Sequence, residues 1–298
     1  VPPNETSSQA VFAFHELRYD SVDFQVGGRY EHQNVSTPAA GLPDRSFNGI
    51  SGSLGAIFRA ADPYSIAISV ARAERLPTAT ELYANGPHAA TRQFEVGDPM
   101  LDEETSFGID LSLLRTAGRI SGQINFFNNQ FDGYIFESPT GDVEDELPVF
   151  RFVQADARFR GVEIETHIEL WHRETRHVEL EAGGDYVRAT AGGGNLPRIP
   201  PLRLRAGVRY EGGPLSGLLE VQRYTRQDDV AAFEQPTGGY TLVNAMAGYR
   251  FFVRNTIHDL LLRATNVTDE LARSHVSPLK DLAPLPGRDF TLSYRLSF

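Results

Sequence analysis

The sequence predicts an all-β protein, an antiparallel up-and-down transmembrane β-barrel wall of about 13 strands. Three observations lead to this fold class. Long runs alternate strictly between apolar and polar residues, which gives a strand one apolar face and one wet face. These runs reach roughly ten residues, the length that a tilted strand needs to cross a bilayer. Tight polar turns and long connections also alternate along the chain, as they do in outer-membrane barrels.

The alternation is clearest in six runs, and one of them fixes the expected facing. In order along the chain, the runs cover residues 22–30, 120–126, 162–170, 178–182, 202–210 and 290–298. Charged rows cannot face hydrocarbon, because a basic residue near the midplane costs ~2–4 kcal/mol and an acidic one somewhat less. We therefore expect one set of side chains of the 162–170 run to face the inside of the curved sheet and the other set to face outside. The inside set is Glu163, Glu165, His167 and Glu169, and the outside set is Val162, Ile164, Ile168 and Leu170.

The connections divide into two kinds that should lie at opposite ends of the strands. Short polar turns are expected near residues 19–21, 59–63, 115–119, 172–176, 211–214 and 252–255, and longer irregular stretches at 33–46, 77–103, 137–157, 190–201, 227–238 and 268–288. We expect the short turns on the periplasmic side, the long ones outside, and no helix longer than two turns. An odd strand number is unusual for a bacterial barrel and no signal peptide precedes the strands, so we expect a portion of a longer protein.

Composition excludes several other classes. Hydrophobic residues make up 41% and the mean hydropathy is −0.31, and no apolar stretch reaches the ~18 residues of a membrane-spanning helix. There is no cysteine, which excludes disulfides and thiolate metal sites. The net charge of −11 argues against a nucleic-acid partner and is compatible with cationic ligands. No catalytic arrangement has a supporting context, so we expect neither an enzyme nor a cofactor.

The last strand carries a second kind of signal. Its alternate positions are apolar and its final residue is aromatic: the set is Phe290, Leu292, Tyr294, Leu296 and Phe298. Such a strand resembles the closing strand of bacterial outer-membrane barrels, which the barrel insertion machinery reads. The resemblance implies that these five residues form a membrane-insertion signal. On this segment alone, an ordinary amphipathic strand of a soluble β-domain fits equally well.

Several segments together resemble one family. Residues 73–83 (AERLPTATELY) and 94–106 (FEVGDPMLDEETS) resemble the R-x-P-T-x-x-E-L-Y and G-N-P-x-L-x-x-E-x-S motifs of TonB-dependent outer-membrane receptors. Residues 125–135 and 160–165 resemble later strands of that family. The C-terminal end of the family's barrel sequence is also similar, to residues 262–270, the Pro-Gly-Arg of 286–288 and the terminal Phe298. The resemblance runs in order over nearly the whole chain.

The resemblance carries expectations about architecture and function. It implies that residues 1–298 are the C-terminal portion of a barrel of about 22 strands, and that the plug domain and TonB box of the family are absent from this chain. The function would be active import of a scarce nutrient, a metal ion, siderophore or other metal chelate, across the outer membrane of a Gram-negative bacterium. The implied partners are TonB (through the missing N-terminal part), the insertion machinery, outer-membrane lipid and lipopolysaccharide, and the substrate. A passive diffusion porin and a soluble β-rich binding or adhesion domain are the alternatives.

A finer resemblance suggests substrate ligands. Residues 85–88, 197–203 and 275–288 resemble the subgroup that includes outer-membrane zinc transporters. His88 lies in a long loop, Glu95 and Asp98 follow within ten residues, and imidazole with carboxylate oxygen suits zinc. We therefore expect His88 as a metal ligand and Glu95, Asp98 and His275 as further substrate-binding residues. A solvated loop histidine is the plain alternative.

Other polar residues are interpreted as structural. His167, His172 and His177 are five apart, which would place successive members on opposite faces, and two of them border a short turn. Four carboxylates are interpreted only as hydrophilic lining of the water-filled lumen, those of Glu163, Glu165, Glu179 and Glu181. The acidic run 142–146 is interpreted as a solvated face that could attract cations or bind ions shared with lipopolysaccharide.

Overall fold

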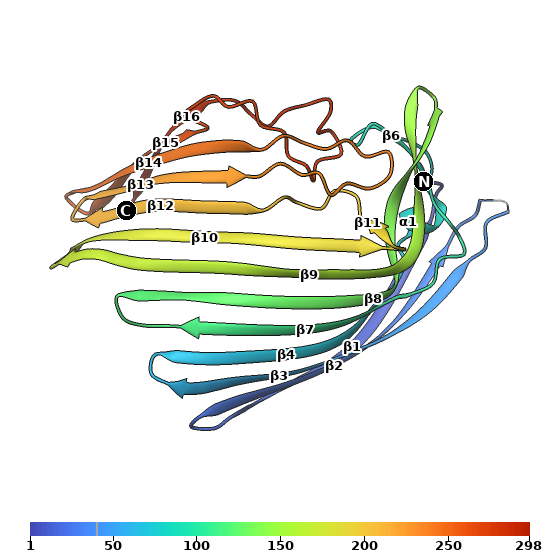
Figure 1. Ribbon diagram of the computed structural model, residues 1–298, viewed down its shortest axis with the longest axis horizontal. Coiled ribbons are helices and arrows are strands. Elements are labelled where there is room, and N and C mark those ends of the chain that lie inside the picture. Colours follow the sequence, from blue (N-terminus) through green and yellow to red (C-terminus); the bar gives the residue numbers. More distant parts are fainter. Residues whose placement is uncertain (40) are drawn as a thin grey trace.

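The chain forms one large curved antiparallel sheet (Figure 1). The computed structural model describes residues 1–39 and 41–298. In this described part, thirteen strands pair in sequence order, which confirms the up-and-down meander. They are β1 (Glu5–Arg18), β2 (Val22–Ser36), β3 (Arg45–Ala61), β4 (Tyr64–Arg75), β7 (Glu104–Arg115), β8 (Ile120–Glu144), β9 (Leu147–Arg173), β10 (Arg176–Ala191), β12 (Arg203–Gly212), β13 (Leu215–Tyr224), β14 (Tyr240–Val253), β15 (Thr256–Thr265) and β16 (Asp289–Ser297). We call these thirteen strands, without residues 133–157 of β8 and β9, the strand wall.

Smaller elements lie in the long connections. The segment between β4 and β7 holds helix α1 (Ala79–Tyr83), β5 (Asn85–His88) and β6 (Gln93–Val96), and β11 (Gly194–Asn195) follows β10. The helix has five residues, so it is shorter than two turns, as expected. Across the described ranges, no helix has the length and apolar character to span a membrane.

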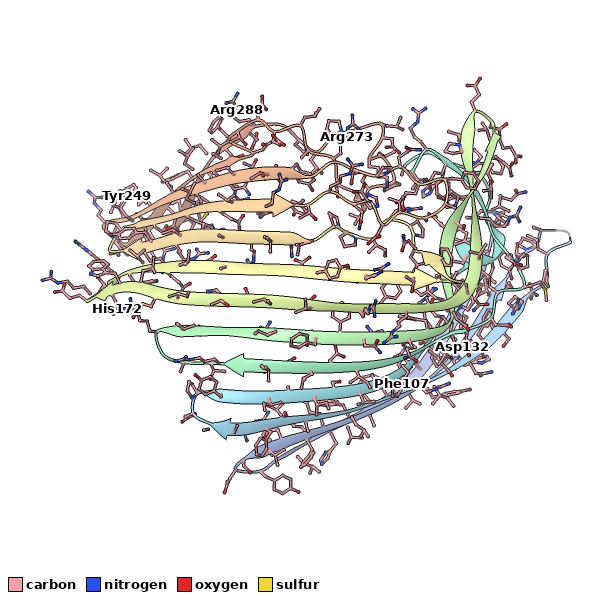
Figure 2. All side chains as sticks on the ribbon, in the orientation of Figure 1. Phe107, Asp132, His172, Tyr249, Arg273 and Arg288 are labelled. Carbon is pink, nitrogen blue, oxygen red and sulfur yellow. The ribbon has the colours of Figure 1, made fainter. Side chains whose placement is uncertain are left out.

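The two ends of the strand wall differ as the sequence predicts. One end, the turn end, carries short turns such as those at residues 19–21, 116–119 and 174–175. The other end carries long connections, and we call residues 76–103, 133–157, 191–202, 225–239 and 266–288 the loop layer. Figure 1 shows the N-terminus at the loop end and the C-terminus at the turn end. In Figure 2, the labelled His172 lies at the turn end and Arg273 at the loop end.

One long connection is not irregular. Residues 137–157 were expected to be a loop, but β8 and β9 continue as a hairpin that pairs as far as Glu144 with Leu147. Pro139 and Gly141, residue types that disfavour regular strand pairing, lie at or within a break in register between Pro139 and Val143. Strand β6 pairs in parallel with β9 alongside this extension, through Phe94 opposite Val149. This pairing satisfies backbone groups of the projecting hairpin, which stands upright in Figure 1.

The register separates an apolar face from a polar one over most of the strand wall, although in β1 Phe12 and Phe14 lie on the same face as Arg29. Ile66 lies opposite Leu113, Leu113 opposite Ile124, and Ile124 opposite Ile164, so apolar residues form continuous rows across strands. Many of these side chains are exposed, as hydrocarbon-facing residues are when no lipid is present; the larger ones include Leu54, Ile68, Phe126, Leu204 and Leu219. A continuous exposed apolar face of this size is typical of a barrel exterior rather than of a soluble sheet.

The opposite face is charged and internally paired. Glu165 lies opposite Gln123, and its carboxylate binds Arg205 at 2.6 Å. Asp185 lies opposite Glu163 and binds Arg203 at 2.6 Å. Glu163, Glu165, His167 and Glu169 all lie on this face, and Val162, Ile164 and Ile168 on the other. The predicted separation is confirmed, except that Leu170 is the extra residue of a bulge opposite Val178 and Glu179.

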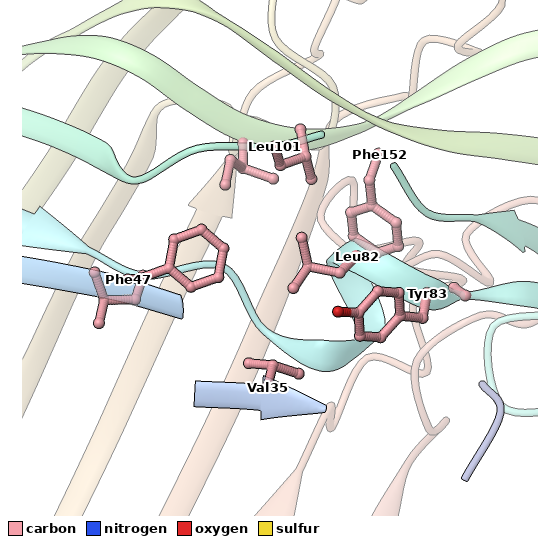
Figure 3. Close-up of a cluster of buried hydrophobic side chains, with 9 residues drawn as sticks. Val35, Phe47, Leu82, Tyr83, Leu101 and Phe152 are labelled. Atoms are coloured by element: carbon pink, nitrogen blue, oxygen red, sulfur yellow. The ribbon is translucent and has the colours of Figure 1, made fainter. Parts of the chain in front are cut away.

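The buried hydrophobic core lies at the loop end. A first cluster joins the ends of β2 and β3 to α1 and the β8–β9 hairpin (Figure 3), through Val35, Phe47, Leu82, Tyr83, Leu101 and Phe152 among others. A second cluster packs Leu196 of the loop layer against alanines of β9 and β10 and against an aromatic group. Within the described residues, every buried hydrophobic side chain lies in the loop layer or in the adjoining strand ends. The loop layer is therefore a packed structure above the strand wall.

Candidate functional site

The segment between β4 and β7 is braced by the residues of its family-like motif. Thr78 caps α1: its hydroxyl accepts from the Glu81 N–H, and the Glu81 carboxylate accepts from the Thr78 N–H at 2.7 Å. Arg75 bridges the two carboxylates of Glu81 and Glu104, at 2.9 and 3.0 Å. Glu104 is buried and also accepts from the N–H of Ile135 at 2.9 Å. The motif therefore ties this segment to the β8–β9 hairpin.

The glycine of the second motif permits a close approach to the helix. Gly97 donates its N–H to the carbonyl of Ala84 at 2.7 Å, and Asp98 donates to the carbonyl of Glu81 at 2.9 Å. A Cβ on Gly97 would lie 2.7–2.8 Å from backbone atoms of α1, which leaves no room for any side chain. Both motifs thus have a structural explanation, and they position the β5–β6 hairpin that follows α1.

The β5–β6 hairpin brings two of the predicted site residues together. The Nδ1 of His88 lies 2.5 Å from Oε1 of Glu95, and the Thr91 hydroxyl donates to the same oxygen at 3.2 Å. The Glu95 side chain is 7% exposed, whereas that of His88 is 51% exposed. Because a carboxylate only accepts, Nδ1 of His88 is the donor, and in the neutral ring the lone pair is then on Nε2. A histidine oriented in this way by a carboxylate is the usual form of a metal-ligating imidazole.

The structure modifies the expected roles of the two carboxylates near His88. Glu95 contacts the imidazole and is buried beneath it, an arrangement suited to orienting the ring. Asp98 accepts a hydrogen bond from the N–H of Met100 at 2.8 Å and caps the turn that follows β6. In the part of the chain that the structure describes, neither residue joins His88 in a set of three metal-ligand atoms.

Sequence reasoning missed Gln93. It lies directly opposite His88 in the β5–β6 register, and it is 4% exposed. Among the described residues, its Oε1 atom is buried with no hydrogen-bond partner. A buried unsatisfied amide oxygen beside a candidate ligand is unusual in a folded protein. Residue type alone gave no signal, because the side chain of an isolated glutamine in a loop is normally solvated.

His275 lies in a different, buried network. Its Nε2 atom is 3.1 Å from Oε1 of Glu234, and its Nδ1 atom is 3.0 Å from the Thr237 hydroxyl. Lys280 also binds Oε1 of Glu234, at 2.7 Å. We call Glu234, Thr237, His275 and Lys280 the buried ionic network. The His275 side chain is fully buried, with Nδ1 beside the Thr237 hydroxyl and Nε2 facing the Glu234 carboxylate, which argues against a ligand role beside His88.

The buried ionic network joins three connections of the loop layer. Glu234 and Thr237 lie between β13 and β14, and His275 and Lys280 lie between β15 and β16. The backbone N–H of Arg198, between β10 and β12, donates to Glu234 at 2.9 Å. Burial opposes ionisation of Glu234, but hydrogen bonds from His275, from Lys280 and from two backbone N–H groups outweigh it and lower its pKa to about 2.

Four of the five residues of the predicted insertion signal lie in the edge strand β16. Phe290, Leu292, Tyr294 and Leu296 lie opposite Ala264, Leu262, Leu260 and His258 of β15, on the apolar face of the strand wall. Phe298 follows the strand and is exposed. The alternation expected of this strand is therefore present, and its recognition by the insertion machinery stays a prediction.

Comparisons with known proteins agree with this geometry. Residues 1–267 match the family model described as TonB dependent receptor-like, β-barrel. Among solved structures, the copper transporter OprC is 18% identical with a TM-score of 0.83 over 98% of this chain and 47% of that one. The FrpB iron transporter from Neisseria meningitidis is 14% identical with a TM-score of 0.73, over 98% of this chain and 45% of that one. BauA, the ferric preacinetobactin receptor from Acinetobacter baumannii, is 17% identical with a TM-score of 0.71, over 98% of this chain and 42% of that one.

These matches define family and location. At such low identity the solved structures establish the fold alone, and this chain spans less than half the length of each of them. The family model, by contrast, covers most of the chain. Together with the exposed apolar face, it places the protein in the outer membrane of a Gram-negative bacterium. The chain belongs to the TonB-dependent receptor β-barrel family.

Proposed function

We propose that residues 1–298 are the C-terminal portion of the barrel of an active-transport receptor that imports a metal ion or metal chelate, energised by TonB. The observation that carries the metal assignment is the His88–Glu95 pair, which holds an exposed imidazole nitrogen free for a ligand at the loop end. Three similar structures are a copper transporter, an iron transporter and a ferric preacinetobactin receptor, which supports a metal cargo.

The division of labour follows from the fold. The strand wall, with its exposed apolar face, is the membrane scaffold, and the loop layer supplies recognition at the outer surface. TonB would act on the N-terminal part that family members carry. The reaction is translocation, so no bond in the substrate is made or broken.

In this proposal His88 is a substrate ligand and Glu95 orients it. Nε2 of His88 would bind the metal or a labile position of its chelate. Gln93, opposite His88, would offer its unsatisfied Oε1 to the same ligand. One histidine does not complete a zinc shell, which normally takes three or four protein ligands, so a chelator, water or other loops must supply the rest.

Energised uptake is tested in cells that express the full-length receptor. We expect accumulation of zinc or of a ferric siderophore at limiting supply to fall to background when TonB is deleted. Uptake that persists without TonB, in proportion to external concentration, would instead identify a diffusion porin. A full-length protein that stays in solution without detergent would identify a soluble β-domain.

The role of His88 is tested by growth under metal limitation. We expect Glu95→Gln to require about 10–100-fold more metal or metal chelate for half-maximal growth, and His88→Ala to show a defect at least as large. His172→Ala, an exposed histidine at the turn end, is the matched control. Equal growth of His88→Ala and wild type at equal surface expression would remove His88 from the substrate site.

A further inference from the structure

The polar face of the strand wall carries a second group of metal-ligand atoms, far from His88 along the strands. Nitrogen or oxygen atoms of His167, Glu179 and Glu181 all lie within 4.8 Å of one another. His167 lies directly opposite Glu181 in the β9–β10 register, and its Nδ1 atom is 3.0 Å from Oε1 of Glu179. We propose that these three residues form a binding site for a divalent transition-metal ion on the lumen wall.

The backbone supports this grouping through a bulge. The β9–β10 ladder shifts register between Val178 and Glu179, so that Glu169 and Trp171 face consecutive residues of β10. Bulges re-aim side chains and occur preferentially next to functional sites. Here the bulge also returns His172 to the face of His167, and the rings of His172 and His177 stack at 6.4 Å. The expectation that successive histidines lie on opposite faces is therefore wrong: the extra residue shifts His172 relative to His167, and His177 lies directly opposite His172 across the β9–β10 turn.

Local charge favours a cation. Four carboxylates surround His167 on this face: Glu165, Glu169, Glu179 and Glu181. Arginines pair two of them, since Arg205 binds Glu165 and Arg209 binds Glu181. The other two carboxylates contact histidines: Glu179 contacts His167, and Glu169 contacts His172 at 3.1 Å. The group therefore carries excess negative charge when the histidines are neutral.

The ligand set selects the class of cation. One imidazole nitrogen and two carboxylate oxygens suit zinc and neighbouring divalent transition metals, whereas calcium and magnesium prefer oxygen ligands alone. Arg209 donates to Oε1 of Glu181 and leaves Oε2 of the same carboxylate for a metal. Three protein ligands on a half-exposed wall leave at least one position for water.

The position of the site along the strands indicates at which stage of transport a metal would reach it. His167 lies opposite Ser121, the second residue of β8, and so at the level of the short turns. A metal that entered at the loop end would meet this site at the periplasmic end of the lumen wall. The inference goes beyond the proposed function, because it does not depend on His88 or on which chelate is imported.

Zinc titration of the full-length receptor in detergent tests the proposal. The His88→Ala protein is used as the background, so that the outer site does not contribute. We expect one zinc equivalent that Glu179→Gln weakens at least tenfold. Glu163→Gln, on the same face of β9, is the matched control and should leave the affinity unchanged. With Cu²⁺ as the probe, His167→Gln should remove a nitrogen coupling from the electron paramagnetic resonance spectrum.

Two results would overturn the site. One is equal zinc affinity of the background protein and its Glu179→Gln derivative, with both folded by circular dichroism. The other is a copper spectrum without nitrogen coupling in the background protein. Failure of the proposed import function would show separately, as TonB-independent uptake with the zinc titration unaltered.

Discussion

The strand wall and the loop layer are stabilised by different interactions, although one chain builds both. In the strand wall, backbone ladders hold neighbouring strands, large apolar side chains stand exposed on one face, and charges pair on the other. In the loop layer, side chains pack into buried clusters and a buried ionic network joins three connections. The strand wall therefore depends on the membrane for its apolar face, whereas the loop layer has a core of its own.

The largest difference in stability between the loop layer and the strand wall should follow from breaking the buried ionic network. Replacing Glu234 with alanine leaves Lys280 buried and without its partner carboxylate, and removing one partner of a buried pair costs about 3–5 kcal/mol. We expect this loss in the loop layer, measured as faster hydrogen exchange of residues 225–239 and 266–288. Hydrogen exchange in the strand wall should be unaltered by this substitution. Asp259→Ala, which breaks only an exposed pair with Arg250, is the matched control and should alter exchange in neither region. Uniform loosening of both regions would contradict independent cores.

Core packing provides the next comparison. Leu82 of α1 is fully buried in the first cluster, so Leu82→Ala should destabilise the loop layer by about 2–5 kcal/mol. Leu54 on the apolar face of β3 is 64% exposed. Leu54→Ala creates no cavity, and its effect on resistance to proteolysis should be much smaller. Equal effects of the two substitutions would show that the outer face packs against protein rather than lipid.

Acid should weaken the loop layer before the strand wall. The pKa of Glu234 is about 2 in the folded protein against 4.5 for the ordinary group. Because the folded pKa is the lower one, the stabilisation is complete above pH 4.5 and is lost as pH falls from there toward 2. The shift corresponds to about 3 kcal/mol at neutral pH. The stability difference between wild type and Glu234→Gln should therefore shrink over that interval, and a constant difference would contradict the assigned pKa.

Substitutions at two adjacent residues of β8 test which face of the strand wall contacts lipid. Ile124 lies on the apolar face opposite Ile164, and Gln123 lies on the polar face opposite Glu165. Ile124→Arg should destabilise the folded barrel in bilayers by ~2–4 kcal/mol, whereas Gln123→Arg should cost little beside the carboxylate. Equilibrium folding into lipid vesicles measures both. A larger penalty at Gln123 would mean that the face assignment is reversed.

Sequence reasoning recovered the strand wall because its determinants are local. Alternation along 162–170 fixes which residues share a face, and turn spacing fixes the order of strands. The bulge at Leu170 interrupted the alternation of faces along β9. The β8–β9 extension was not predicted, because Pro139 and Gly141 are residue types typical of loops.

The loop layer was less accessible to the same reasoning. His88 and Glu95 lie seven residues apart, and a short hairpin that the sequence analysis did not predict brings their side chains into contact. The partners of His275 could not be predicted, because Glu234 is 41 residues away and Lys280 belongs to no motif. The grouping of His167 with Glu179 and Glu181 depends on pairing across a hairpin, so spacing along the chain did not indicate it.

The central claim, that the loop layer faces outward from a membrane-spanning strand wall, is most directly tested by labelling of introduced cysteines. The printed chain has no cysteine, so Val143→Cys at the β8–β9 tip and Thr175→Cys in the β9–β10 turn each place a single thiol at an exposed position. A polymer-linked maleimide too large to cross the outer membrane is added to intact cells that express the full-length receptor, with the unsubstituted receptor as background. We predict labelling of Val143→Cys in intact cells, and of Thr175→Cys only after the outer membrane is permeabilised. Labelling of both variants in intact cells, or of Thr175→Cys alone, would contradict the account.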